Sequence, residues 1–131
     1  MKATLFTDGG SRGNPGAAAI GYVLTPETGK AMRHGETIGV ATNNQAEYQA
    51  LLAGMRHARK LKISHLSCFL DSELVVKQLT GIYRIKDADL RVHATAIAAL
   101  VKEFQQVKYT HVRREKNKEA DSLVNEALDN A

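Results

Sequence analysis

The chain has 131 residues, of which 44% are hydrophobic, and this is the length of one domain with a core of its own. Its net charge of +4 suits a protein that meets polyanions, but many other domains are as basic, so charge alone indicates no function. The single cysteine excludes an internal disulfide, and no stretch reaches the roughly 18 apolar residues of a membrane span. We therefore expect one domain over residues 1–131, monomeric and cytoplasmic.

Three strands are predicted in the first third of the chain. They cover residues 3–7, 17–25 and 31–40, and their short connections indicate an antiparallel meander. The stretch TDGGSRGNPG at residues 7–16 holds four glycines, which predicts a loop after the first strand.

Helices and strands alternate in the rest of the chain. Apolar residues recur at helical spacing over 44–60, and HLSCFL at 65–70 predicts a short strand. A helix that starts near residue 72 ends at Gly81, and a second helix covers 87–104. A strand at 107–112 and a last helix from about 117 complete the order βββαβααβα. This order predicts an α/β fold, with a five-stranded mixed sheet flanked by helices.

Four carboxylates stand at the ends of these predicted elements, and each has an explanation that involves no function. Asp71 could be the N-cap of the helix that follows it. Glu47 could complete a capping box with Asn44 as the N-cap. Asp121, in the first turns of the last helix, could interact with the helix dipole. Asp8 follows the first strand directly, where a turn alone does not require an acid.

All four carboxylates share a second feature, because each can point inward from its element. If the sheet brought them together, their charges would repel and raise one another's pKa. Divalent cations would remove that conflict, and oxygen ligands without His or Cys favour Mg²⁺ or Mn²⁺ over Zn²⁺. Two such ions about 3.5–4 Å apart can bind the attacking and leaving oxygens of a phosphodiester.

Four segments resemble, in order, the motifs of the type 1 ribonuclease H family: TDGGSRGNPG at 7–16, TNNQAEYQALLAGM at 42–55, LDSELVVKQLTG at 70–81 and REKNKEADSLVNEAL at 114–128. The resemblance covers nearly the whole chain. It implies the three-layer ribonuclease H-like fold and cleavage of the RNA strand of RNA/DNA hybrids, leaving 5′-phosphate and 3′-hydroxyl ends. It also implies two Mg²⁺ ions, with Mn²⁺ as a substitute, on the catalytic ligands Asp8, Glu47, Asp71 and Asp121.

The resemblance further implies a set of substrate contacts: Gly9, Gly10, Ser11, Asn14, Thr42, Asn43, Asn44 and Glu73. The asparagines match positions in the minor groove of the hybrid, where short polar groups can read the 2′-hydroxyl. Thr42 matches a position that holds a phosphate of the DNA strand, although residues 42–45 also suit a simple helix cap. Glu73 stands where a glutamine often contacts the RNA.

Two departures from the family pattern affect substrate handling. Many members carry a histidine on a loop before the last aspartate, but here that loop is short and His111 continues the predicted strand. We therefore expect Arg114 to take the loop position, as in short-loop relatives. The basic, Trp-containing protrusion that follows the third motif in well-known bacterial members is missing, which predicts weaker hybrid binding or a different way of holding the substrate. Arg84 and Lys86 could compensate in part.

Three other functions remain alternatives at this point. By resemblance to short-loop relatives, the protein could cut double-stranded RNA as well as hybrids. A non-catalytic nucleic-acid-binding domain of the same fold would gain nothing from four clustered negative charges. An actin-like or sugar-kinase-like nucleotide-binding domain, whose first strand also ends in Asp-Gly-Gly, would need a second domain.

Overall fold

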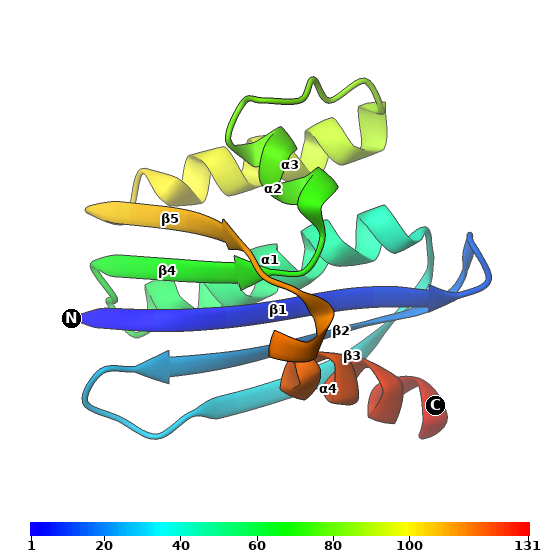
Figure 1. Cartoon of the computed structure of the whole chain (residues 1–131), viewed down its shortest axis with the longest axis horizontal. Coiled ribbons are helices and arrows are strands. Elements are labelled where there is room, and N and C mark those ends of the chain that lie inside the picture. The colour runs from blue at the N-terminus through cyan, green and yellow to red at the C-terminus, as the bar shows by residue number, and fades with distance from the viewer.

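The computed structural model describes residues 1–131 and contains five strands and four α-helices (Figure 1). The strands are β1 (Lys2–Arg12), β2 (Gly16–Pro26), β3 (Met32–Ala41), β4 (His65–Leu70) and β5 (Gln106–His111). The helices are α1 (Asn43–Lys60), α2 (Glu73–Leu79), α3 (Ala88–Val101) and α4 (Lys118–Asp129). The predicted order βββαβααβα is confirmed, and a short 3₁₀ helix, η1 (Arg114–Lys116), precedes α4.

The strands form one mixed sheet in the order β3-β2-β1-β4-β5. The first three strands are antiparallel, while β4 is parallel to both β1 and β5. Helices α1 and α3 lie behind this sheet in Figure 1, and α4 crosses its front. Side chains alternate across a strand, so neighbouring positions of β1 face α1 and α4 in turn. The architecture is the predicted three-layer α/β fold.

The main hydrophobic core lies between the sheet and helices α1, α2 and α3. It is mostly aliphatic, as the low aromatic content requires, and Cys68 is fully buried in it. Its largest fully buried aliphatic side chains come from both layers: Leu5, Leu24, Leu51, Met55, Leu66, Leu70 and Ile97. Burial of one such side chain stabilises the fold by roughly 1.5–3 kcal/mol. This core holds α1 against β1, and at one end of that contact Glu47 of α1 meets Gly9 of β1.

The glycine-rich segment differs from the prediction, because most of it is strand rather than loop. Strand β1 continues past Asp8, and its pairing with β2 ends only at Arg12. The turn is confined to residues 13–15, where Gly13 has a φ of 90°. Gly9 lies against the main chain of α1, and a Cβ atom there would collide with the carbonyl group of Ala46. A glycine in this strand therefore serves the close approach of a helix.

Substitution of Gly9 by alanine is expected to lower the free energy of unfolding by about 1–3 kcal/mol, the usual cost of overpacking. The added methyl group meets backbone atoms of Ala46, which cannot rotate away. Gly29→Ala is the control, because a Cβ there meets only Pro26 at 3.6 Å. Urea denaturation of both variants measures the difference. A Gly9→Ala protein as stable as Gly29→Ala would show that α1 shifts at no cost.

Candidate functional site

Strand register places Asp8 and Asp71 side by side. The parallel pairing of β1 with β4 runs from Lys2–His65 to Thr7–Leu70, and the two aspartates are the next residues on each chain. Asp8 was predicted to follow the first strand directly, but β1 continues past it with β2 as its partner. It lies instead where the parallel pairing ends, and ligands gather beyond the carboxyl ends of parallel strands.

Glu47 reaches the same point from α1. The N-cap of α1 is Thr42, and the capping box is completed by Gln45, so the expected box of Asn44 with Glu47 is wrong. As the fifth residue of the helix, Glu47 lies beyond the capping positions. One of its carboxylate oxygens accepts a hydrogen bond from the Gly9 amide at 2.5 Å. The absence of a side chain on Gly9 allows this approach.

The capping explanation for Asp71 is also wrong. Ser72 is the N-cap of α2, and its hydroxyl accepts a hydrogen bond from the Val75 amide at 3.3 Å. The Asp71 carboxylate is therefore free of the helix and accepts a hydrogen bond from the Asn117 side chain at 3.1 Å.

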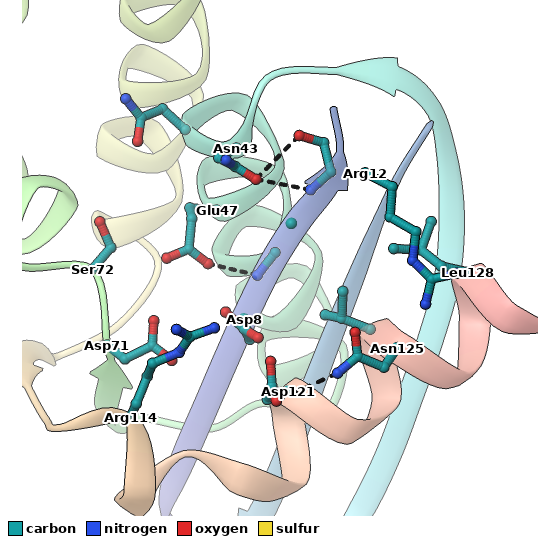
Figure 2. Close-up of a pocket in the computed structure, with 15 residues that line it drawn as sticks. Asp8, Arg12, Asn43, Glu47, Asp71, Ser72, Arg114, Asp121, Asn125 and Leu128 are labelled. Atoms are coloured by element: carbon teal, nitrogen blue, oxygen red, sulfur yellow. Dashed lines mark hydrogen bonds between the residues drawn. The ribbon is translucent and has the colours of Figure 1, made fainter. Parts of the chain in front are cut away.

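Three of the four predicted carboxylates meet at one point. Asp8, Glu47 and Asp71 each offer an oxygen, and these three atoms lie within 4.8 Å of one another. Asp121, on the first turn of α4, lines the same pocket, and Figure 2 shows it beside Asp8. The pocket has a volume of about 340 Å³. Four distant segments of the chain thus bring carboxylates to one open cavity.

Burial and mutual repulsion shift the ionisation of this cluster. Burial, followed by the charge of Asp71, raises the pKa of Asp8 to about 7. Burial is also the main reason that the pKa of Glu47 lies well above its ordinary value, and the charges of Asp8 and Asp71 raise it further. Without a cation, the Asp8 carboxyl group therefore loses its proton only near neutral pH. A bound divalent cation would favour the ionised carboxylates instead.

The fold buries very few polar residues, and all of them belong to or adjoin the carboxylate cluster. Only Thr7, Asp8, Glu47 and Asn117 are both polar and buried. Burial of polar groups costs free energy unless they are paired, so their concentration here is a strong mark of a functional site.

Five of the eight proposed substrate contacts line the pocket: Gly9, Gly10, Ser11, Asn43 and Asn44. The Asn43 side-chain oxygen accepts hydrogen bonds from the amide and hydroxyl of Ser11 at 2.9 and 3.1 Å. The Asn14 side chain does not line the pocket, but it accepts a hydrogen bond from the Asn43 amide at 3.0 Å. These bonds join the β1–β2 turn to the start of α1.

Thr42 and Glu73 lie outside the pocket lining. The Thr42 hydroxyl accepts a hydrogen bond from the Gln45 amide at 3.1 Å, so the helix-cap explanation holds for this residue. Glu73 begins α2, and its carboxylate lies 3.1 Å from the Lys77 ammonium and 3.9 Å from the His111 ring. Glu73 is therefore paired with a cation of its own, Lys77.

Arg114 is in η1 and lines the pocket, where Figure 2 shows it beside Asp71. His111 is the last residue of β5, which confirms that it belongs to the strand.

The sequence did not indicate two further residues of this region. Arg12 lines the pocket and pairs with Asp129 at 2.5 Å, and Asn117 holds Asp71. No local pattern marks Asn117, because its partners Thr7 and Asp71 lie 110 and 46 residues away in the chain.

No helix in the structure combines the length and the apolar character that crossing a membrane would require.

The profile of the reverse transcriptase-like family matches residues 6–127. Ribonuclease HI of Halobacterium salinarum is 46% identical over 127 residues, which cover 96% of this chain and 64% of that protein. The bifunctional protein Rv2228c of Mycobacterium tuberculosis is 41% identical over 133 residues, covering 100% of this chain and 36% of that protein. The chain thus spans under two thirds of the length of these relatives.

Solved structures agree with the sequence comparison. The crystal structure of RNase H1 from Halobacterium salinarum has a TM-score of 0.95 and 45% identity, with all of both chains covered. LC11-RNase H1, solved in complex with an RNA/DNA hybrid, has a TM-score of 0.91 and 38% identity, covering 98% of this chain and 97% of that one. Fold, family profile and relatives therefore lead to one assignment: this chain belongs to the ribonuclease HI family.

Proposed function

We propose that this protein is an endoribonuclease that hydrolyses the RNA strand of RNA/DNA hybrids by two-metal-ion catalysis, leaving 5′-phosphate and 3′-hydroxyl ends. The observation that carries the proposal is that carboxylate oxygens of Asp8, Glu47 and Asp71 lie within 4.8 Å of one another. The pocket beside them is lined by polar groups of residues 9–11, 43 and 44. Family membership and the hybrid bound to LC11-RNase H1 support the choice of substrate.

The donor set fits a hard divalent cation. The group contains carboxylates only, with neither His nor Cys, and this chemistry favours Mg²⁺ or Mn²⁺. Asp8, Glu47, Asp71 and Asp121 would hold the ions. When bound, two ions would activate a water molecule and stabilise the departing 3′ oxygen. Burial raises the pKa of Asp8 and of Glu47, and a bound cation would favour their ionised form.

The polar residues that line the pocket would position the duplex. Hydrogen bonds among Ser11, Asn14 and Asn43 hold these groups rigid, so little side-chain entropy is lost when a minor groove docks. The amides of Asn43 and Asn44 and the backbone of Gly9, Gly10 and Ser11 would then face the sugars, where the 2′-hydroxyl distinguishes RNA from DNA.

Two groups at or beside the pocket, Thr42 and Arg114, would contact phosphates. The Thr42 hydroxyl accepts a hydrogen bond within its cap, and its own proton can still be donated to a phosphate of the DNA strand. Arg114 would attract the scissile phosphate, but it is always protonated and cannot shuttle a proton. Lys77 beside Glu73 would reduce the repulsion between that carboxylate and the RNA.

Strand-labelled duplexes test the proposal directly. RNA/DNA, RNA/RNA and DNA/DNA duplexes are incubated with Mg²⁺, with Mn²⁺ or with EDTA, and the ends of the products are identified. We expect cleavage of the RNA in the hybrid, only with metal. Cleavage of RNA/RNA would widen the substrate class. Binding of the hybrid without cleavage under either metal would contradict catalysis and favour a binding domain.

We further propose that residues 1–131 act as a single domain and a monomer in the cytoplasm. Light scattering would test the monomeric state.

A further inference from the structure

Asn117 joins three of the segments that carry the carboxylates. It lies between η1 and α4 and is 1% exposed. Its side-chain nitrogen donates hydrogen bonds to the Thr7 carbonyl at 2.8 Å and to Oδ2 of Asp71 at 3.1 Å. Its own carbonyl accepts a hydrogen bond from the Asp121 amide at 3.1 Å. Since Thr7 directly precedes Asp8, one residue ties together the segments of three carboxylates.

The contacts of Asn117 determine which way its amide group points. Both neighbours, the Thr7 carbonyl and the Asp71 carboxylate, are hydrogen-bond acceptors. Only the nitrogen end of the amide can face them, because the oxygen would be repelled by both. The nitrogen has two hydrogens, and each of them has a partner.

This orientation leaves the other end of the amide unsatisfied. The side-chain oxygen of Asn117 is the one buried side-chain polar atom in the structure that has no hydrogen-bond partner. Asn117 also makes no side-chain capping bond to α4, although it occupies the N-cap position. A buried acceptor without a donor lowers stability, so neither capping nor burial explains an asparagine here. The two bonds made by the nitrogen remain as the reason.

We propose that Asn117 is a positioning residue that orients the Asp71 carboxylate for metal binding. It occupies Oδ2 and leaves the second oxygen of Asp71 free for a cation, while it holds β1 one residue before Asp8. This inference rests on the proposed function. Groups that orient a metal ligand in this way typically change metal affinity or activity by about 10- to 100-fold when they are removed.

The test compares wild type with Asn117→Ala in the full chain. Calorimetry measures Mn²⁺ binding, and cleavage kinetics give kcat and KM separately. We expect the Mn²⁺ Kd to rise by about 10-fold or more and kcat to fall. The KM for the hybrid should stay unchanged, because the substitution leaves the residues that would contact the duplex in place. The control is Tyr22→Phe, which removes a hydrogen bond of 2.9 Å to His57 away from the pocket. It should lower the melting temperature and leave metal affinity and kinetics as in wild type.

The outcomes separate the two proposals. A folded Asn117→Ala protein with wild-type Mn²⁺ affinity and kcat would overturn the positioning role alone. A wild-type protein that neither binds Mn²⁺ nor cuts the hybrid would overturn the proposed function. If the variant does not fold, NMR of wild type decides, because the side-chain amide protons of Asn117 should exchange slowly and shift when Mg²⁺ is added. Fast exchange, or no shift at saturating Mg²⁺, would overturn the positioning role.

Discussion

Asp8→Asn is expected to abolish cleavage of the hybrid while the fold stays intact. Asp8 lies at the centre of the cluster, next to Glu47 and Asp71, and beside Asp121. An asparagine there offers one neutral oxygen and an amide that repels cations. Loss of roughly 4 kcal/mol of transition-state stabilisation corresponds to a fall in kcat of about 1000-fold. Single-turnover cleavage at saturating Mg²⁺ measures this fall.

Glu103→Gln is the control for the loss of a negative charge. Glu103 is exposed and pairs with Arg59 at 3.0 Å, outside the pocket. Its replacement should leave cleavage at the wild-type rate. Circular dichroism should show that both variants are folded. A wild-type rate in Asp8→Asn would contradict the assignment of this cluster as the metal site.

The metal-free protein is expected to lose stability as the pH rises from about 4 to about 7. Burial and the charge of Asp71 raise the pKa of Asp8 from 3.8 to about 7 in the folded chain, and the pKa of Glu47 is shifted in the same direction. Between these values the folded state holds a proton that the unfolded state has released. The stabilising effect is complete below pH 4 and disappears as the pH passes through 7. Asp8 alone contributes on the order of 4 kcal/mol over this window.

Urea denaturation in EDTA at several pH values measures this effect, and Asp8→Asn is the matched control. The variant lacks the group with the raised pKa, so its stability should fall less over the same window. The difference between the two curves removes the contribution of the other titrating groups. Without metal at pH 7, the variant should be the more stable protein. Two parallel curves would show that Asp8 ionises at its ordinary pKa.

Saturating Mg²⁺ should reverse the slope for wild type. Ions that bind only the folded state stabilise it, and they favour the ionised carboxylates, so their effect grows with pH. Asp8→Asn should show little of this gain.

Much of the fold follows from local sequence patterns. The strand predicted at 65–70 is β4 with the same ends, and the order of all nine predicted elements is confirmed. Apolar spacing of two or near four residues reports directly whether a segment is strand or helix. The family motifs predicted that the four carboxylates and Arg114 share one site, and all five residues line one pocket. The continuation of the strand pattern predicted that His111 belongs to β5.

Other features depend on the tertiary structure alone. Asp8 and Asp71 meet because β1 and β4 pair in parallel, between segments more than 50 residues apart in the chain. The glycine-rich sequence predicts a loop at Gly9, whereas in the structure Gly9 lies in β1 against the backbone of α1. Asn117 directly precedes α4, but its side chain bonds to the distant residues Thr7 and Asp71 and makes no capping bond. Local propensity describes what one segment prefers by itself, but strand register, close packing and buried hydrogen bonds arise between distant segments. Only the folded chain brings those segments together.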